Sequence, residues 1–471
     1  MSSNRDLKDI LRVMLGNITT ILSGVIVGFL LPKELSLADY GFYKTFTLYI
    51  TYMGLFSLGI IDGIVLIYGG KDFEQLEPNL FRSYFKYFTA VLTVVSSGII
   101  LSALLFAKGE TQFIFVMIGI DMVAGNLINY FRQISQITQR FKEYSARTIL
   151  QSAAKTAAVL ILLVLSRLGC RVGYRFFLSL IVLTDVLLTL WYIYTYRVLA
   201  IGQSAPLRET RPLIRNLILT GFPLLFSNLT VQIIMALDRQ FVSVLFSKED
   251  YAIYAFAYNM LSLVAIAISA ISTVLYPTLK RKDADVLKDS YDSLISIILM
   301  LVFGALLSFF PLCWILEWFL QKYLPSIEIF RIIFPGLAIS SAISIVMHNY
   351  YKVMDNSLAF FRKSIVILIL SAAANAAAYY FFRSMASISM VSILTLLIWY
   401  VYAESYFVKT LQYRRWRNLL YMCLVMASFY LISGFSRGPA GAALYLLTFL
   451  VISLVFFKDI LKGIKNRTVF K

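Results

Sequence analysis

Long apolar stretches recur along this chain and are separated by short polar connections. A helix that crosses a bilayer needs about 20 mostly apolar residues, because the hydrocarbon core offers no water to unpaired backbone groups. We expect about fourteen such helices, at residues 10–31, 42–66, 84–106, 111–131, 147–167, 174–196, 213–237, 251–277, 290–311, 327–351, 364–382, 387–407, 418–434 and 439–457. The predicted fold class is an all-α, polytopic membrane protein.

The pattern also repeats within the chain. SLADYGFY, from Ser36 to Tyr43, is echoed by SKEDYAIY, from Ser247 to Tyr254. At the same offset, GNIT ending at Thr19 matches SNLT ending at Thr230. Self-similarity in an apolar chain indicates a duplicated half, and transporters commonly bind substrate near the interface of two repeats.

The repeat predicts the domain organisation. We expect a six-helix bundle at 1–200, a cytoplasmic linker at 201–216, a second six-helix bundle at 217–410 and a terminal helix pair with a tail at 411–471. Because each bundle has an even number of helices, the repeats should be parallel and related by an axis along the membrane normal.

Composition and charge support a membrane protein and exclude other classes. The chain has 60% hydrophobic and 14% charged residues, against roughly 25% charged in soluble domains. Its net charge of +18 is explained by alternate connections that hold about thirty basic residues, which the positive-inside rule places on the cytoplasmic side together with both termini. We therefore expect no nucleic-acid partner.

The chain lacks the signatures of common enzymes. It has no GxxxxGK[ST] loop, so we expect no ATP hydrolysis, and its loops are too short for a catalytic domain. One histidine and three cysteines, without metal-ligand spacing, predict neither a metal site nor a disulfide framework. We expect no enzyme and no cofactor, with transport driven by a proton or sodium gradient or by substrate flux.

Charges inside predicted helices are the candidate functional residues, because each costs roughly 2.5–3.5 kcal/mol at mid-bilayer and so should face a cavity or a partner. Asp121 and Lys155 lie near mid-depth of neighbouring predicted helices, beside small and polar residues. They fit either two polar faces of a lumen or a structural Asp–Lys bridge with close helix packing.

Six further charges fall inside predicted helices. As anion-binding residues of a cationic cavity we assign Lys44, Arg239 and Arg331 together with Lys155, and as ion-coupling or charge-pair residues Asp62, Asp185 and Asp238 together with Asp121. Arg331 precedes Pro335-Gly336, where a helix break can expose backbone to a cavity. Hydration near an interface or snorkelling of Lys44 remains the alternative.

Aromatic side chains offer a second kind of contact. Five tyrosines of the repeated segments can stack on sugar rings or form an interfacial aromatic belt: Tyr40, Tyr43, Tyr251, Tyr254 and Tyr258.

Three segments resemble a known family. LPKELSLADYGFYKTF, GFPLLFSNLTVQIIMALDRQFVSVLFSKEDYAIYAFAYNM and LYPTLKR are similar to the Wzx-type polysaccharide flippases of the multidrug/oligosaccharidyl-lipid/polysaccharide exporter superfamily. The resemblance implies a bacterial inner-membrane protein that moves an undecaprenyl-pyrophosphate-linked oligosaccharide to the periplasmic leaflet by alternating access, for O-antigen, capsule or exopolysaccharide. It implies a polymerase and other export proteins as partners, and places Asp238 and Arg239 on the family's frequent charged pair.

Two other functions stay open. A drug or metabolite antiporter of the same superfamily typically has twelve helices and an acidic ion-coupling site in the first bundle. A membrane glycosyltransferase, polymerase or ligase typically places carboxylates or a basic cluster on a sizeable periplasmic loop. If the cationic cavity is real, Lys155→Ala and Arg331→Ala should each reduce transport without affecting expression.

Overall fold

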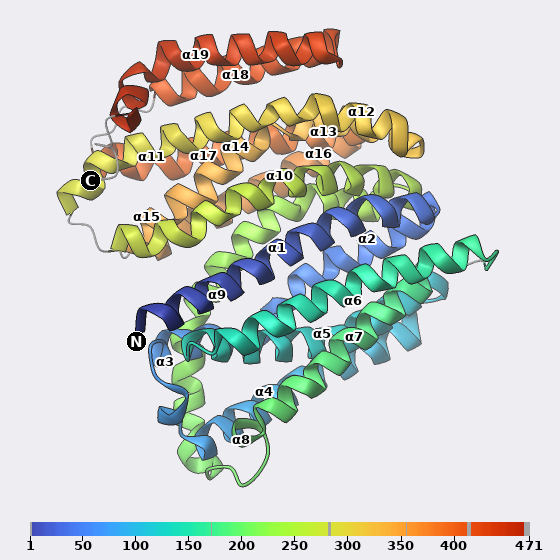
Figure 1. Cartoon of the computed structure of the whole chain (residues 1–471), viewed down its shortest axis with the longest axis vertical. Coiled ribbons are helices and arrows are strands. Elements are labelled where there is room, and N and C mark those ends of the chain that lie inside the picture. Colours follow the sequence, from blue (N-terminus) through green and yellow to red (C-terminus); the bar gives the residue numbers. More distant parts are fainter. Residues whose placement is uncertain (1, 171, 281–283, 355, 412–415, 466–471) are drawn as a thin grey trace. The chain divides into compact units, whose positions relative to one another are not determined.

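The computed structural model describes residues 2–170, 172–280, 284–354, 356–411 and 416–465 (Figure 1). These residues form helices joined by short connections, and no strand occurs among them. The prediction of an all-α chain is therefore confirmed. The chain divides into an N-terminal unit, Met1–Gln232, and a C-terminal unit, Ile233–Lys471, and helix α9 continues from one into the other. Each unit is described by itself.

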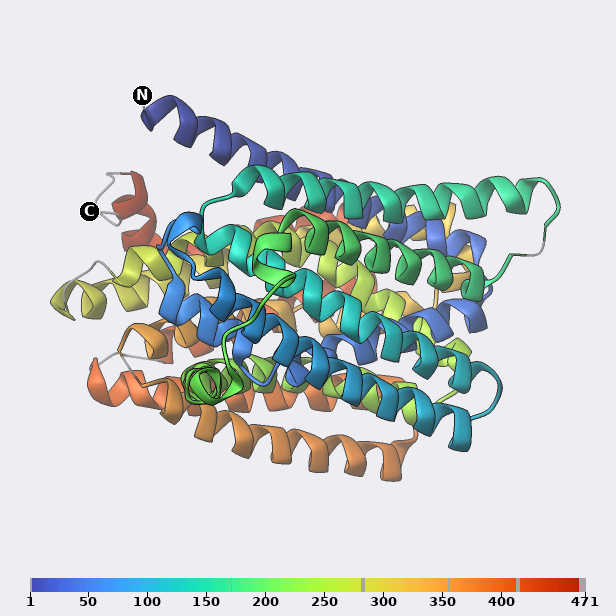
Figure 2. The ribbon, with the colours of Figure 1, turned by 90° about the horizontal axis from the view of Figure 1, so that it is seen from below.

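Helices of the N-terminal unit pack as neighbouring pairs. α1 packs along α6, α5 contacts both α4 and α7, and α6 and α7 run side by side in both views (Figure 1 and Figure 2). The elements are α1 (Ser2–Glu34), α2 (Leu37–Tyr52), η1 (Met53–Ser57), α3 (Ile60–Tyr68), η2 (Phe73–Gln75), α4 (Pro78–Phe106), α5 (Gly109–Ile137), α6 (Phe141–Arg167), α7 (Tyr174–Thr195), α8 (Arg197–Ala200) and α9 (Leu207–Leu245).

The C-terminal unit combines long helices with one broken helical segment. α16 packs against α17, and α18 packs against α19 (Figure 1). The elements are α10 (Lys248–Lys280), α11 (Ala284–Ala305), η3 (Leu306–Ser308), α12 (Phe309–Phe319), η4 (Gln321–Tyr323), α13 (Ser326–Ile333), α14 (Gly336–Ser341), η5 (Ala342–Met347), α15 (His348–Val353), α16 (Ser357–Phe382), α17 (Met385–Thr410), α18 (Trp416–Phe435) and α19 (Pro439–Lys465). Arg281 of the LYPTLKR segment lies outside the described residues.

The described helices account for the apolar stretches of the sequence. Among the described residues, eleven helices are long and apolar enough to cross a membrane, and thirteen spans result if each of two bent helix pairs counts as one. Large apolar side chains such as Phe106 and Phe435 remain 84% and 91% exposed, as suits a lipid-facing surface. The chain is a multi-pass membrane protein. A count of fourteen spans and the parallel repeat stay predictions.

Two spans are broken by a sharp bend. Leu58 and Gly59 have left-handed backbone, with φ of 51° and 80°, and a bend of 58° separates α2–η1 from α3. The second bend, of 45°, separates α13 from α14 at Pro335, because proline has no N–H to continue the helical hydrogen bonds. This confirms the break predicted at Pro335-Gly336.

The repeated segments begin helices in the same way. Ser36 caps α2 by accepting a 3.1 Å hydrogen bond from the backbone N–H of Asp39. Ser247 accepts a 3.0 Å bond from the N–H of Asp250 before α10. Each serine satisfies an otherwise unpaired N–H of the first helical turn, so the sequence repeat corresponds to a repeated local structure.

Candidate functional site

Two carboxyl groups lie buried together in the N-terminal unit. Asp121 of α5 and Asp185 of α7 are each 6% exposed, and their carboxyls are close enough to interact by a hydrogen bond and by charge. Asp185 Oδ1 accepts a 2.7 Å hydrogen bond from the Gln151 side chain, and Gln151 in turn accepts a 2.9 Å bond from Arg132. One oxygen of Asp121, Oδ1, has no hydrogen-bond partner in the described chain.

Lys155 is a charged neighbour of this pair. It acts on Asp121 through its charge, but no Lys155–Asp121 ion pair within 4.0 Å occurs in the described ranges. The structure therefore brings Asp121, Asp185 and Lys155 together, and both Asp185 and Lys155 act on Asp121. Neighbouring buried carboxyls repel one another unless they share a proton. The cluster is therefore suited to proton exchange.

The two other candidate charges of the N-terminal unit are Lys44 of α2 and Asp62 of α3. The ammonium of Lys44 lies 5.2 Å and 5.7 Å from the ring centroids of Tyr40 and Tyr43, within the range of cation–π attraction. Asp62 is half-buried in the first turn of α3, directly after the break at Gly59.

In the C-terminal unit, Asp238 is held by tyrosines. Its carboxylate accepts a 2.7 Å hydrogen bond from the Tyr254 hydroxyl and another from the Tyr258 hydroxyl. Asp238 Oδ1 also accepts a 2.7 Å bond from the backbone N–H of Arg239. Ser389 donates to the Tyr254 oxygen at 3.2 Å. Asp238 is 3% exposed, so these donors replace the water that the carboxylate lost on burial.

Arg239 turns to a cavity of about 410 Å³ inside the same unit. Its guanidinium stacks over the Tyr258 ring, 4.5 Å from the centroid, and donates a 3.1 Å bond to the Met235 carbonyl. We call this space the serine cavity, because besides Arg239, Tyr258 and apolar residues it is lined by five serines: Ser262, Ser340, Ser341, Ser344 and Ser392.

The broken helical segment supplies part of this lining, including three of the five serines. Gly336 and Leu337, directly after Pro335, line the cavity, and so do residues of the π-helical turn that follows. Non-helical backbone at membrane depth is tolerated where protein buries it or where it lines a cavity, and π-turns often occur at functional sites. The sequence therefore places polar groups and irregular backbone around one space.

Arg331 does not line the serine cavity. Its guanidinium lies against Gly434 of α18, and its Nε has no hydrogen-bond partner within the described ranges. The structure thus separates Arg331 from Arg239, although both are half-buried in the same unit.

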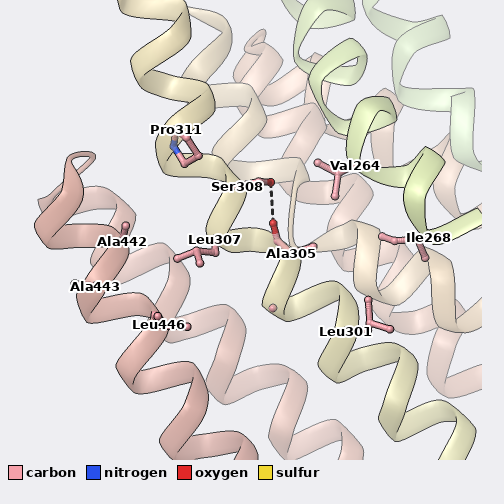
Figure 3. Close-up of a pocket in the computed structure, with 11 residues that line it drawn as sticks. Val264, Ile268, Leu301, Ala305, Leu307, Ser308, Pro311, Ala442, Ala443 and Leu446 are labelled. Carbon is pink, nitrogen blue, oxygen red and sulfur yellow. Dashed lines mark hydrogen bonds between the residues drawn. The ribbon is translucent and has the colours of Figure 1, made fainter. Parts of the chain in front are cut away.

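A second, apolar space adjoins the serine cavity. The apolar groove, about 700 Å³ in volume, lies between α11–α12, α19 and α10 (Figure 3). Its lining includes Leu301, Leu307, Ala443 and Leu446, and the hydroxyl of Ser308 is turned to the Ala305 carbonyl at 2.8 Å. Ile268 of α10 lines both spaces, so an apolar and a polar compartment meet at one side chain.

Several sequence expectations need correction or addition. Tyr40, Tyr251 and Tyr254 are at most 1% exposed, so neither an interfacial belt nor sugar stacking applies to them; they pack inside the bundles. The serines were missed, although Ser340 and Ser344, four residues apart after the Pro-Gly break, were a readable signal. Cys170, Cys313 and Cys423 are free thiols.

Comparison with known proteins places this arrangement in a family. The sequence profile of the family described as "Polysaccharide biosynthesis protein" matches residues 7–283. No curated protein sequence matches the chain.

Several solved structures share this fold at low sequence identity. The lipid II flippase MurJ in an inward closed conformation is similar with a TM-score of 0.71 and 12% identity, over 97% of this chain and 100% of that chain. An inward-facing multidrug resistance MATE family transporter of the MOP superfamily is similar with a TM-score of 0.59 and 15% identity, over 86% and 99% of the chains. A MOP superfamily transporter from Pyrococcus furiosus gives 0.54 and 14%, over 86% and 95%. The matching family is described by polysaccharide biosynthesis, and the fold is that of a solved flippase and of solved transporters, in agreement with the expectation that the chain is not an enzyme.

Proposed function

Because the chain belongs to the polysaccharide biosynthesis protein family, we propose that it is a flippase for a lipid-linked oligosaccharide. In this proposal the substrate is a polyprenyl-pyrophosphate-linked repeat unit, which passes from the cytoplasmic to the periplasmic leaflet by alternating access. The product serves surface polysaccharide synthesis, such as O-antigen, capsule or exopolysaccharide. We place the protein in the bacterial inner membrane with both termini cytoplasmic and with a polymerase as downstream partner.

One observation carries the proposal: the polar serine cavity and the apolar groove meet at Ile268. A lipid-linked sugar is amphipathic, so its transporter needs a polar compartment for the head and an apolar compartment for the chain. Each volume lies within the roughly 300–1,000 Å³ of typical ligand sites. A soluble polar metabolite would have no use for the apolar groove.

The same geometry disfavours an antiporter of cationic drugs. Arg239 lines the serine cavity, whereas the carboxylate of Asp238 accepts hydrogen bonds from Tyr254 and Tyr258. A positive charge in a partly desolvated cavity repels a cation and favours oxygen-rich or anionic groups.

We further propose that Asp121 and Asp185 couple transport to a proton gradient. Their proximity supports this, since proton uptake or release at the pair changes its repulsion, and Lys155, a base beside the pair, responds to the same change. The unpaired Oδ1 of Asp121 gives a proton a free acceptor.

A leaflet assay tests the function. In a host deleted for this chain, lipid-linked repeat units should accumulate on the cytoplasmic face while surface polysaccharide is lost, and the intact chain should restore both. Lys155→Ala and Arg239→Ala should restore less surface polysaccharide at equal membrane abundance. The sequence analysis predicts the same for Arg331→Ala. Normal translocation in the deleted host, together with altered resistance to toxic cations, would favour the antiporter.

A further inference from the structure

We propose that the serine cavity binds a sugar ring of the substrate, through hydrogen bonds that the sugar hydroxyls donate to serine oxygens. This inference rests on the proposed function and adds to it which part of the substrate this space recognises. Its evidence is the direction of the hydrogen bonds around the cavity.

Most of the serine protons are already committed to the protein. Ser262 donates to the Asn259 carbonyl at 2.7 Å and Ser344 to the Ser340 carbonyl at 2.7 Å. Ser340 donates to the Leu337 carbonyl at 3.2 Å, and Ser392 to the amide oxygen of Asn375 at 3.3 Å. A hydroxyl has one proton and two lone pairs, so these four oxygens face a ligand as acceptors.

The remaining polar groups complete a mixed set. Ser341 makes no side-chain hydrogen bond within the described ranges, so its hydroxyl can donate or accept. Arg239 donates one N–H to the Met235 carbonyl and has further N–H donors for a ligand oxygen. The cavity thus combines several acceptors with one strong donor group.

This set matches a polyhydroxylated ring better than a phosphate. Each sugar hydroxyl donates one hydrogen bond and accepts others, so a ring can supply protons to Ser340, Ser344 and Ser392 while it accepts from Arg239. A phosphate dianion offers acceptors alone, and to donate to it Ser262, Ser340, Ser344 and Ser392 would each have to give up the hydrogen bond that they make within the protein. Apolar side chains such as Ile333, Ile393 and Leu396 line the rest of the cavity and suit the C–H face of a ring.

Two probes separate recognition of the sugar from recognition of the lipid pyrophosphate. The first is lipid-linked oligosaccharide extracted from producing cells, and the second is undecaprenyl pyrophosphate without sugars. Binding of each to the full chain in nanodiscs would be measured for wild type and for the triple variant Ser340→Ala, Ser341→Ala, Ser344→Ala. The matched control is Ser364→Ala, because Ser364 makes the same type of bond, 2.8 Å to the Phe360 carbonyl, outside the cavity lining.

We expect wild type to bind the glycosylated probe more tightly. The triple variant should lose about tenfold or more in affinity for this probe, as expected for up to three lost hydrogen bonds, with its affinity for the sugar-free probe unchanged. Unchanged affinity for the glycosylated probe would overturn the inference, and so would an equal loss for both probes, which would assign the cavity to the pyrophosphate. If wild type bound neither probe, the proposed function itself would fail. A thermal unfolding curve equal to that of Ser364→Ala excludes misfolding of the triple variant.

Discussion

The hydroxyl of Tyr254 donates a 2.7 Å hydrogen bond to the carboxylate of Asp238, and both side chains are buried. Asp238 and Arg239 are adjacent in the sequence, which suggests a charged pair, yet their side chains contact different groups. Asp238 is satisfied by tyrosines and by backbone, which leaves the guanidinium of Arg239 for the serine cavity. Tyr254 therefore supports the cavity without lining it.

Removal of this hydroxyl should destabilise the protein. In Tyr254→Phe the buried carboxylate of Asp238 loses one of its donors, at a cost of about 1–3 kcal/mol, and the thermal midpoint of the detergent-solubilised protein should fall. Tyr43→Phe is the matched control at the equivalent position of the repeat, because the Tyr43 hydroxyl has no hydrogen-bond partner within the described ranges. Equal midpoints for the two variants would contradict the role assigned to Tyr254.

The acidic pair gives a prediction on pH dependence. Asp121→Asn keeps the volume of the side chain and can donate its amide to Asp185, so the fold should be retained while no proton is exchanged at position 121. We expect the transport rate in proteoliposomes to become nearly independent of pH between about 5 and 8, where the wild type responds to an imposed proton gradient.

Asp292→Asn is the control for this experiment. Asp292 pairs with Arg417 at 2.6 Å on a half-exposed surface, and such pairs contribute little, about 0–1 kcal/mol. Its pH profile should equal that of wild type. A wild-type profile in Asp121→Asn as well would exclude the acidic pair from coupling.

The sequence predicted the helices because membrane insertion depends on local composition. The predicted spans fall on described helices or broken helical segments, with 174–196 ending one residue past α7, since a run of about 20 apolar residues has few alternatives in a bilayer. The break at Pro335 was also predicted, because proline cannot continue a helix. The bend at Leu58 was missed, because a leucine in a left-handed conformation cannot be recognised from the sequence.

Side-chain partners were harder to predict, because they depend on which helices are neighbours. The sequence predicts Asp121 and Lys155 at a similar depth in the membrane, but it does not indicate that Asp185, on a third helix, also interacts with Asp121. Likewise, nothing in the sequence joins Asp238 to Ser389 through Tyr254. The depth of a side chain in the membrane follows from its position along its own helix. Contact between side chains depends on how several helices pack, which the sequence does not show directly.

Close packing of α3 against α9 predicts a strong effect of a single methyl group. A Cβ at Gly221 would overlap the backbone of Gly59 and Gly63, and a Cβ at Gly63 would overlap the Leu217 backbone. Since backbone cannot move aside, Gly221→Ala should destabilise by about 1–3 kcal/mol. Gly98→Ala meets open space and should be neutral or slightly stabilising. Thermal unfolding of both variants checks this, and a neutral Gly221→Ala would contradict the close contact.

The apolar groove provides the sharpest test of a lipid-linked substrate. Ala443 lines the groove on α19 (Figure 3), and Ala443→Trp would fill much of it without adding charge. If the groove holds the polyprenyl chain, transport should fall about tenfold or more, because the loss of a few buried CH₂ groups at roughly 0.8 kcal/mol each is enough. Leu447→Trp is the control on the same helix, since Leu447 is 62% exposed and does not line the groove. Accumulation of lipid-linked repeat units on the cytoplasmic face, measured at equal membrane abundance, should be high for Ala443→Trp and at the wild-type level for Leu447→Trp. If both variants transported normally, the lipid chain would have to travel outside this groove, and the amphipathic pair of compartments would no longer support a flippase.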